Sequence, residues 1–168
     1  MPKLILPIEP YNVSGYEFGS KVGRWLGFRA IHLGDDVVVP AGTSVKAVGD
    51  GEVVWSEVRA GSQEKGNWGG IMVIAHKSKE AVFYAIYGHM KDLEVVVGDR
   101  VIIGQQLGVV AEALTPENGW WKIPHLHFAV YTGPWHEKIL PGYWRIWERR
   151  TKKKWWKDPK SFIENNNE

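Results

Sequence analysis

Short apolar runs separated by glycine-containing turns make up most of the middle of the chain. Valine and isoleucine are frequent in these runs, and β-branched residues favour strands over helices. No amphipathic pattern extends beyond two helical turns. The predicted strands cover residues 37–39, 44–55, 71–75, 81–87, 95–97, 101–103, 107–111 and 126–131. This succession of short strands predicts an all-β fold, a small antiparallel sandwich or barrel.

Two stretches of this strand region share one pattern of valines and glycines. When the sequence is shifted by 56 residues, five residues of the first stretch align with identical residues of the second. In the first stretch they are Val39, Gly42, Val45, Val53 and Val54; in the second they are Val95, Gly98, Val101, Val109 and Val110. Within the first stretch, Gly-Asp-Gly at 49–51 predicts a hairpin between the flanking strands. Two copies of a strand–turn–strand unit can pack face to face. The alternative is coincidence in a chain rich in valine and glycine.

The composition is that of a globular protein. Hydrophobic residues make up 44% and charged residues 24% of 168 residues, so one domain spanning 1–168 is expected. Its core is predicted at about residues 25–132, followed by a tryptophan-rich, basic C-terminal extension over 133–168. Segments 60–70 and 115–124 contain glycine or proline and are predicted loops.

Composition and charge exclude several classes of function. The chain has no cysteine, which removes disulfides, thiol catalysis and cysteine-ligated metals, so any metal must bind His, Asp or Glu. The net charge of +2 is too small to indicate nucleic acid as a partner. No apolar run approaches the roughly 18 residues of a membrane span. The apolar stretch Leu4–Leu6 is broken by Pro7 and is too short for a signal peptide, so none is expected in this chain.

The histidines supply a candidate metal site. His125 and His127 lie two residues apart in a predicted strand, so both side chains project from one face, roughly 6.5–7 Å apart. His32 and Asp36 flank a glycine that lets the chain bend, so both can converge on one ion. Two imidazoles and one carboxylate form a three-ligand zinc site with an open fourth position, the layout of a catalytic zinc. The alternative is a His-x-His on a half-exposed strand among unrelated polar residues.

The order of the motifs adds a family resemblance. No His-Glu-x-x-His, Gly-x-Ser-x-Gly, phosphate loop or Gly-x-Gly-x-x-Gly is present. The informative segments are His-Leu-Gly-Asp-Asp at 32–36, 39–54, 69–76, Tyr-Gly-His-Met at 87–90, 97–105, His-Leu-His-Phe at 125–128 and Asp-Pro at 158–159. In this order they resemble the lysostaphin-like zinc metallopeptidases, peptidoglycan endopeptidases with the duplicated hybrid motif fold. The match extends from about residue 27 to residue 131, with 158–159 in addition.

The resemblance implies a role for each of five residues. His32, Asp36 and His127 would bind one Zn²⁺ ion, while His89 and His125 would orient water and stabilise the tetrahedral intermediate. It also implies an antiparallel β-sandwich with a groove over the zinc and a peptide of the cell wall as the substrate. A location in the cell envelope or outside the cell would follow from that role.

The same comparison gives the other residues lesser roles. His76 falls on a core strand position and is expected to be structural, whereas His136 matches nothing and is expected on the surface. Loop 112–124 is longer and bulkier than the family's usual glycine-rich loop and would wall the groove. Trp120 and Trp121 in that loop are candidates for stacking on glycan, while most other tryptophans are expected to serve packing.

The C-terminal extension and two other functions remain open at this point. Residues 133–157 are unusual for the family, and the basic run 149–154 is expected to be a solvated face, with an anionic wall polymer as the alternative partner. A non-catalytic regulatory or binding module of the same fold is one alternative function. A phosphocarrier that pairs two histidines is another, although that chemistry gives Asp36 no purpose. Nothing in the sequence indicates an oligomeric state.

Overall fold

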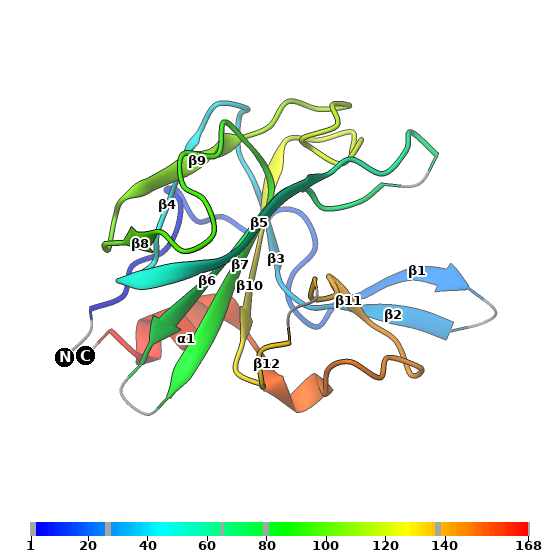
Figure 1. Cartoon of the computed structure of the whole chain (residues 1–168). Helices are drawn as coiled ribbons and strands as arrows, with labels where there is room; N and C mark the ends of the chain where they lie inside the picture. The colour runs from blue at the N-terminus through cyan, green and yellow to red at the C-terminus, as the bar shows by residue number, and fades with distance from the viewer. Residues whose placement is uncertain (1–2, 26–27, 65, 79–80, 137–138, 168) are drawn as a thin grey trace.

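The fold is built around one large antiparallel sheet (Figure 1). The computed structural model describes residues 3–25, 28–64, 66–78, 81–136 and 139–167. Within these ranges the sheet follows the order β12-β10-β7-β6-β5-β8, with β3 on β10, and β9 joining β4 and β7. Its strands are β3 (Asp35–Val38), β4 (Ser44–Lys46), β5 (Gly51–Arg59), β6 (Gly69–Lys77), β7 (Val82–Lys91), β8 (Arg100–Val101), β9 (Gln106–Val110), β10 (His125–Tyr131) and β12 (Trp156–Lys157). The predicted all-β, antiparallel fold is confirmed.

A second, three-stranded sheet lies beside the first (Figure 1). It contains β1 (Lys21–Trp25), β2 (Phe28–His32) and β11 (Tyr143–Trp144) in the order β1-β2-β11. None of these strands is predicted from the sequence, because they are short and partly exposed. Residue 27, where the family resemblance is expected to begin, lies outside the described residues.

Two short helical elements complete the C-terminal part. The 3₁₀ turn η1 covers Lys153–Trp155, and α1 covers Pro159–Asn165. The Asp-Pro motif starts α1: the Asp158 carboxylate accepts a hydrogen bond from the backbone N–H of Ser161, and Pro159 occupies the first turn. No helix among the described residues is long and apolar enough to cross a membrane.

Strands β6, β7 and β10 are buried on both faces, which explains their continuous apolar runs in the sequence. Alternate side chains pack into two separate clusters. The first cluster includes Met72, Tyr87 and Phe128, and the second includes Ile71 and Tyr131. The second cluster is covered by side chains of the C-terminal segment, namely Leu140 and Trp156, with Trp135, Trp144 and Trp155 packed around them. The expectation that most tryptophans serve packing is therefore confirmed for these four.

The two copies of the repeat exchange strands. The first strand of copy one, β4, pairs with β9, the second strand of copy two, and β8 of copy two pairs with β5 of copy one. The hairpin predicted at 49–51 is therefore wrong, because β4 and β5 each pair with the other copy. The turn glycines Gly42 and Gly98 have the same left-handed backbone, with φ of 84° and 94°.

Two details of the repeat differ from the sequence pattern. The apolar run 95–97 forms no strand; it leads into the second copy's turn, where the Asp99 side chain accepts a hydrogen bond from the Val96 N–H. In the closing valine pair, Val53 and Val110 are the inward-facing residues, whereas Val54 and Val109 are half-buried. The structural equivalence therefore shifts by one residue from the offset of 56 at the end of the repeat.

Candidate metal centre and active site

Three strands bring the predicted metal ligands together. His32 is the last residue of β2, Asp36 lies in β3 and His127 lies in β10. The antiparallel register of β3 and β10 places Asp36 directly opposite His127. Because a strand directs alternate side chains to one face, His125 projects to the same side as His127, as predicted.

The ligand atoms of this group converge on one point. Nε2 of His32 lies 3.2 Å and Nδ1 of His127 lies 3.0 Å from Oδ1 of Asp36. The three ligand atoms lie within 4.8 Å of one another, and the residues are 0%, 8% and 3% exposed. The two imidazole rings meet edge to face, with their centroids 4.7 Å apart.

The electrostatics of the group fit a divalent cation. Burial acts to raise the pKa of Asp36, but the interactions with His127 and His32 outweigh it and hold that pKa well below its usual range. Burial lowers the pKa of His127 to about 4, so its ring is neutral near pH 7. Nε2 of His32 is buried without a hydrogen bond of ordinary geometry, although it is aimed at Asp36. Two imidazole nitrogens beside a carboxylate are a donor set that Zn²⁺ prefers.

His89 is placed by a β-bulge. The register of β6 and β7 shifts between Gly70 and Met72, because β7 carries one extra residue there. His89 has a positive φ of 64°, an uncommon backbone conformation for a residue other than glycine. Its N–H donates to the carbonyl of Trp68 at 2.9 Å, and its ring centroid lies 4.4 Å from that of His125. Burial lowers the pKa of His89 well below its usual value, with a smaller contribution from His125.

His125 is oriented by loop 112–124. Its Nδ1 lies 2.8 Å from the carbonyl oxygen of Ile123 and must carry the proton, since a carbonyl only accepts. Nε2 is then left without a proton in the neutral ring, and it lies 3.9 Å from Oδ1 of Asp36. The predicted catalytic pair, His89 and His125, therefore lies side by side next to the three ligands.

Asn118 supports both histidines of this pair and is missed by sequence reasoning. Its buried side-chain amide donates to the carbonyls of Trp121, at 2.9 Å, and Ile123, at 3.4 Å, and the second of these carbonyls is the one that holds His125. The backbone of Asn118 also hydrogen-bonds to His89. No signal in a single sequence marks an asparagine in a loop for this role.

Loop 112–124 forms one wall of the site, as predicted. Two hydrogen bonds join it to Asn67 in the loop before β6, from Asn67 N to Gly119 O at 3.1 Å and from Trp121 Nε1 to Asn67 O at 3.0 Å. A third, from Gly70 N to Glu117 O at 2.8 Å, joins it to the start of β6. The pocket beside the wall has a volume of about 420 Å³. Its lining includes His89, His125, Asp36, Trp120, Trp121 and Tyr143.

Tyr143 forms the opposite side of the site, and sequence reasoning missed it too. It comes from the C-terminal segment, where the pairing of β11 with β2 sets it opposite His32, with the rings 5.5 Å apart. Burial raises the pKa of Tyr143 to about 12, so the hydroxyl stays protonated at neutral pH. Tyr143 also lines a smaller pocket of about 160 Å³ that contains Trp68 and His127.

The other histidines lie where the sequence predicts them. His76 is buried outside the metal cluster, with Nδ1 3.0 Å from the carbonyl oxygen of Asp50 and its ring stacked on Phe83. His136 is exposed. Asp35, beside the predicted ligand Asp36, accepts hydrogen bonds from the Tyr11 hydroxyl and the Phe18 N–H, which gives it a structural role.

Comparison with known sequences identifies the family. The model described as Peptidase family M23 matches residues 30–138. The chain belongs to peptidase family M23. The match ends at residue 138, inside the C-terminal extension and before Tyr143. The resemblance inferred from the order of the motifs is thereby confirmed.

Two M23 relatives with curated names show the extent of the similarity. Glycyl-glycine endopeptidase ALE-1 of Staphylococcus capitis is 35% identical over 125 residues, covering 73% of this chain and 28% of the relative. Lysostaphin of Staphylococcus simulans is 33% identical over 121 residues, covering 69% and 22%. The chain thus spans about a quarter of the length of these relatives.

Solved structures agree with this assignment to M23. The catalytic domain of lysostaphin from Staphylococcus simulans superposes with a TM-score of 0.60 at 25% identity, covering 89% of this chain and 90% of that domain. A zinc-containing peptidase from Vibrio cholerae gives a TM-score of 0.60 at 25% identity, covering 74% and 35%.

Proposed function

We propose that this chain is a zinc-dependent endopeptidase that hydrolyses peptide bonds in the cross-links of peptidoglycan. The observation that carries the proposal is the convergence of two imidazoles and a carboxylate beside a second histidine pair, at the edge of an open pocket. The relatives described as a glycyl-glycine endopeptidase and as lysostaphin support the substrate class. A cell-envelope or extracellular location would follow from this function.

The proposed ligands of the zinc ion are Nε2 of His32, Oδ1 of Asp36 and Nδ1 of His127. When bound, a zinc ion with three protein ligands and one open position polarises a carbonyl and lowers the pKa of water to about 7. The side-chain carboxylate of Asp36 is ionised throughout the neutral range because its pKa is held low, so it needs no deprotonation before it binds a cation.

The proposed catalytic pair would divide the handling of protons and charge. His125, with its Nδ1 proton held by the Ile123 carbonyl, presents Nε2 as a proton acceptor for the attacking water. His89 is neutral at pH 7, because burial lowers its pKa, and its ring would pack beside His125 where charge develops at the scissile carbonyl. Tyr143, which stays protonated, adds a neutral hydroxyl to the lining of the same pocket.

The test combines metal analysis with digestion. The purified chain is expected to bind one zinc ion and to cleave purified cell walls and defined cross-link peptides, with products identified by mass and cleavage lost on chelation. His125→Ala should abolish cleavage while zinc remains bound, whereas His127→Ala should lose the zinc. A folded preparation that binds no divalent metal would overturn the proposal.

The non-catalytic alternative has no observation in its favour, because each predicted ligand and both members of the catalytic pair lie together. The phosphocarrier alternative is also disfavoured, since Asp36 contacts both His32 and His127 directly. Stacking of glycan on Trp120 and Trp121 stays a prediction, as does the absence of a nucleic-acid partner.

A further inference from the structure

Positive charge is concentrated in the C-terminal segment that flanks the site. Residues 141–160 contain eight Lys and Arg residues against two carboxylates, a net charge of +6 in a chain whose net charge is +2. The rest of the chain is therefore net acidic. Such a concentration of positive charge favours binding of an anionic ligand by this segment where its charged side chains are accessible.

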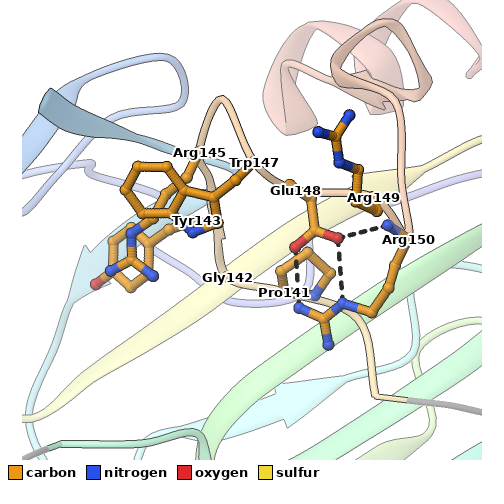
Figure 2. Close-up of a pocket in the computed structure, with 8 residues that line it drawn as sticks. All are labelled: Pro141, Gly142, Tyr143, Arg145, Trp147, Glu148, Arg149 and Arg150. Carbon is orange, nitrogen blue, oxygen red and sulfur yellow. Dashed lines mark hydrogen bonds and ion pairs between the residues drawn. The ribbon is translucent and has the colours of Figure 1, made fainter.

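Part of this charge lines a pocket of about 430 Å³ formed by residues 141–150 (Figure 2). Glu148 neutralises Arg150 there: its Oε1 accepts from Nε at 3.1 Å and its Oε2 accepts from a terminal nitrogen at 2.9 Å. Arg145 and Arg149 form no ion pair with a carboxylate of the described residues. Figure 2 shows Arg145 beside Tyr143 and Trp147, and Arg149 near the Glu148–Arg150 pair.

Arg145 is held at the end of the pocket that adjoins the proposed active site. Its guanidinium carbon lies 5.9 Å from the ring centroid of Trp147, a cation–π arrangement that limits its mobility. Its charge reaches Tyr143, where it opposes the rise in pKa that burial causes first. Gly142 and Tyr143 line both this pocket and the smaller pocket that contains His89. The basic pocket therefore adjoins the site, with Gly142 and Tyr143 between them.

We propose that this pocket is a subsite for a carboxylate group of the peptide substrate, bound mainly by Arg145 and secondarily by Arg149. This inference rests on the proposed endopeptidase function and adds a preference for peptides that carry a free carboxylate near the scissile bond. The planar guanidinium of arginine matches a carboxylate with two parallel hydrogen bonds.

A carboxylate fits the pocket better than a phosphate polymer does. Of its three arginines, Arg145 and Arg149 lack an ion pair with the described carboxylates, which suits one or two carboxylates of a short peptide. A long polyanion would instead engage the lysine run 152–154, none of which lines this pocket. Tyr143 contacts His32 and lines the same pocket as Arg145, so a ligand in this pocket would lie on the side of Tyr143 that faces away from the metal ligands or next to it.

The test measures binding separately from cleavage. His125→Ala prevents turnover, and calorimetry then compares two cross-link peptides that differ only in a free carboxylate or a carboxamide. We expect about tenfold tighter binding of the carboxylate form, reduced by high salt. Adding Arg145→Gln should remove this preference, and Lys153→Gln, which removes one charge outside the pocket, should leave it intact. Arg145→Lys should keep this preference only in part, because lysine has the positive charge but not the planar guanidinium that makes two parallel hydrogen bonds.

A second measurement uses the zinc-loaded chain with His125 present. Arg145→Gln should raise KM for the carboxylate peptide about tenfold, leave kcat nearly unchanged and leave the carboxamide peptide unaffected. Equal binding of both peptides by the chain with an intact pocket would overturn the subsite, as would equal losses in Arg145→Gln and Lys153→Gln. Displacement from the pocket by poly(glycerol phosphate), without a carboxylate preference, would assign it to a phosphate polymer instead.

These results separate the two proposals. A chain that binds zinc and cleaves both peptides equally retains the endopeptidase function and loses the subsite. A chain that discriminates between the peptides in calorimetry but cleaves neither retains the subsite and loses the endopeptidase function. Circular dichroism of each variant establishes that the fold is intact.

Discussion

Gly34 leaves the space that the imidazole of His127 occupies. A Cβ built on Gly34 would lie 2.7 Å from Nε2 of His127 and 2.5 Å from the carbonyl oxygen of Phe128, closer than real Cβ atoms approach. From the sequence alone, Gly34 is expected to let the chain bend between His32 and Asp36. The structure shows a different role, since Gly34 has no positive φ and is required by the close approach of β10.

Gly34→Ala is therefore expected to displace His127 and weaken the metal site. We expect zinc affinity to fall by at least about tenfold, because one of three proposed ligands moves from Oδ1 of Asp36. Equilibrium dialysis with a zinc indicator measures the change. Gly19→Ala is a matched control, because a Cβ there meets nothing within 4 Å, although its φ of 83° adds backbone strain. Unchanged zinc affinity in folded Gly34→Ala would contradict the prediction.

Asn118→Ala should lower kcat while zinc stays bound. The substitution removes the amide that donates to the Trp121 and Ile123 carbonyls, so the carbonyl that orients His125 becomes less fixed. Loss of these buried hydrogen bonds should also reduce the free energy of unfolding by about 1–3 kcal/mol. Kinetics, zinc analysis and urea unfolding measure the three effects, and Asn165→Ala on the exposed side of α1 serves as the control. A fall in stability with kcat unchanged would reduce Asn118 to a purely structural residue.

Trp121 is the better placed of the two candidates for contact with glycan. Trp121 is 38% exposed and lines the pocket of about 420 Å³ beside the loop. Its ring meets that of His89 edge to face, with the centroids 6.3 Å apart. Trp121→Ala should weaken binding of glycan strands about tenfold without changing zinc content, since stacking on an aromatic face is lost. Trp121→Phe keeps a ring but loses the hydrogen bond to the Asn67 carbonyl, and should retain most of the binding. If co-sedimentation with glycan strands is the same for both variants and the unmodified chain, the stacking hypothesis fails.

His76 should make stability fall in mild acid. Burial lowers the pKa of His76 to about 4 from its ordinary value of 6.5, so between these values the unfolded chain takes up a proton that the folded chain excludes. The contribution of His76 to the free energy of unfolding is fully present above about pH 6.5 and is lost as the pH falls to about 4, a change of about 3 kcal/mol. Urea unfolding of the metal-free chain between pH 4 and 7 measures it. His76→Gln keeps a donor to the Asp50 carbonyl and should make the profile less steep, while buried His127 and His89 still contribute to the fall; identical slopes would refute the assignment.

The sequence predicts best those parts whose environment is uniform along the chain. Strands β6, β7 and β10 are recognisable because both of their faces are buried, and the ligand motifs because their spacing reflects strand geometry. The hairpin at 49–51 was wrong because the pairing partners lie in the other repeat copy. Tyr143 and Asn118 were missed for different reasons. Tyr143 acts through its pairing with His32 on a distant strand. The side chain of Asn118 bonds within its own loop, and that loop conformation follows no sequence pattern.

The exchange of strands between the two repeat copies has a consequence for folding. Each copy leaves its own first strand unpaired until the other copy has been synthesised and positioned, so the pairing joins residues far apart along the chain, such as Val45 with Gly108. Neither copy can form a closed unit by itself, and contacts of such long range slow the search for the native state. Among the described strands β4 pairs with β9 alone, so β4 gains its backbone hydrogen-bond partners only once β9 is in place.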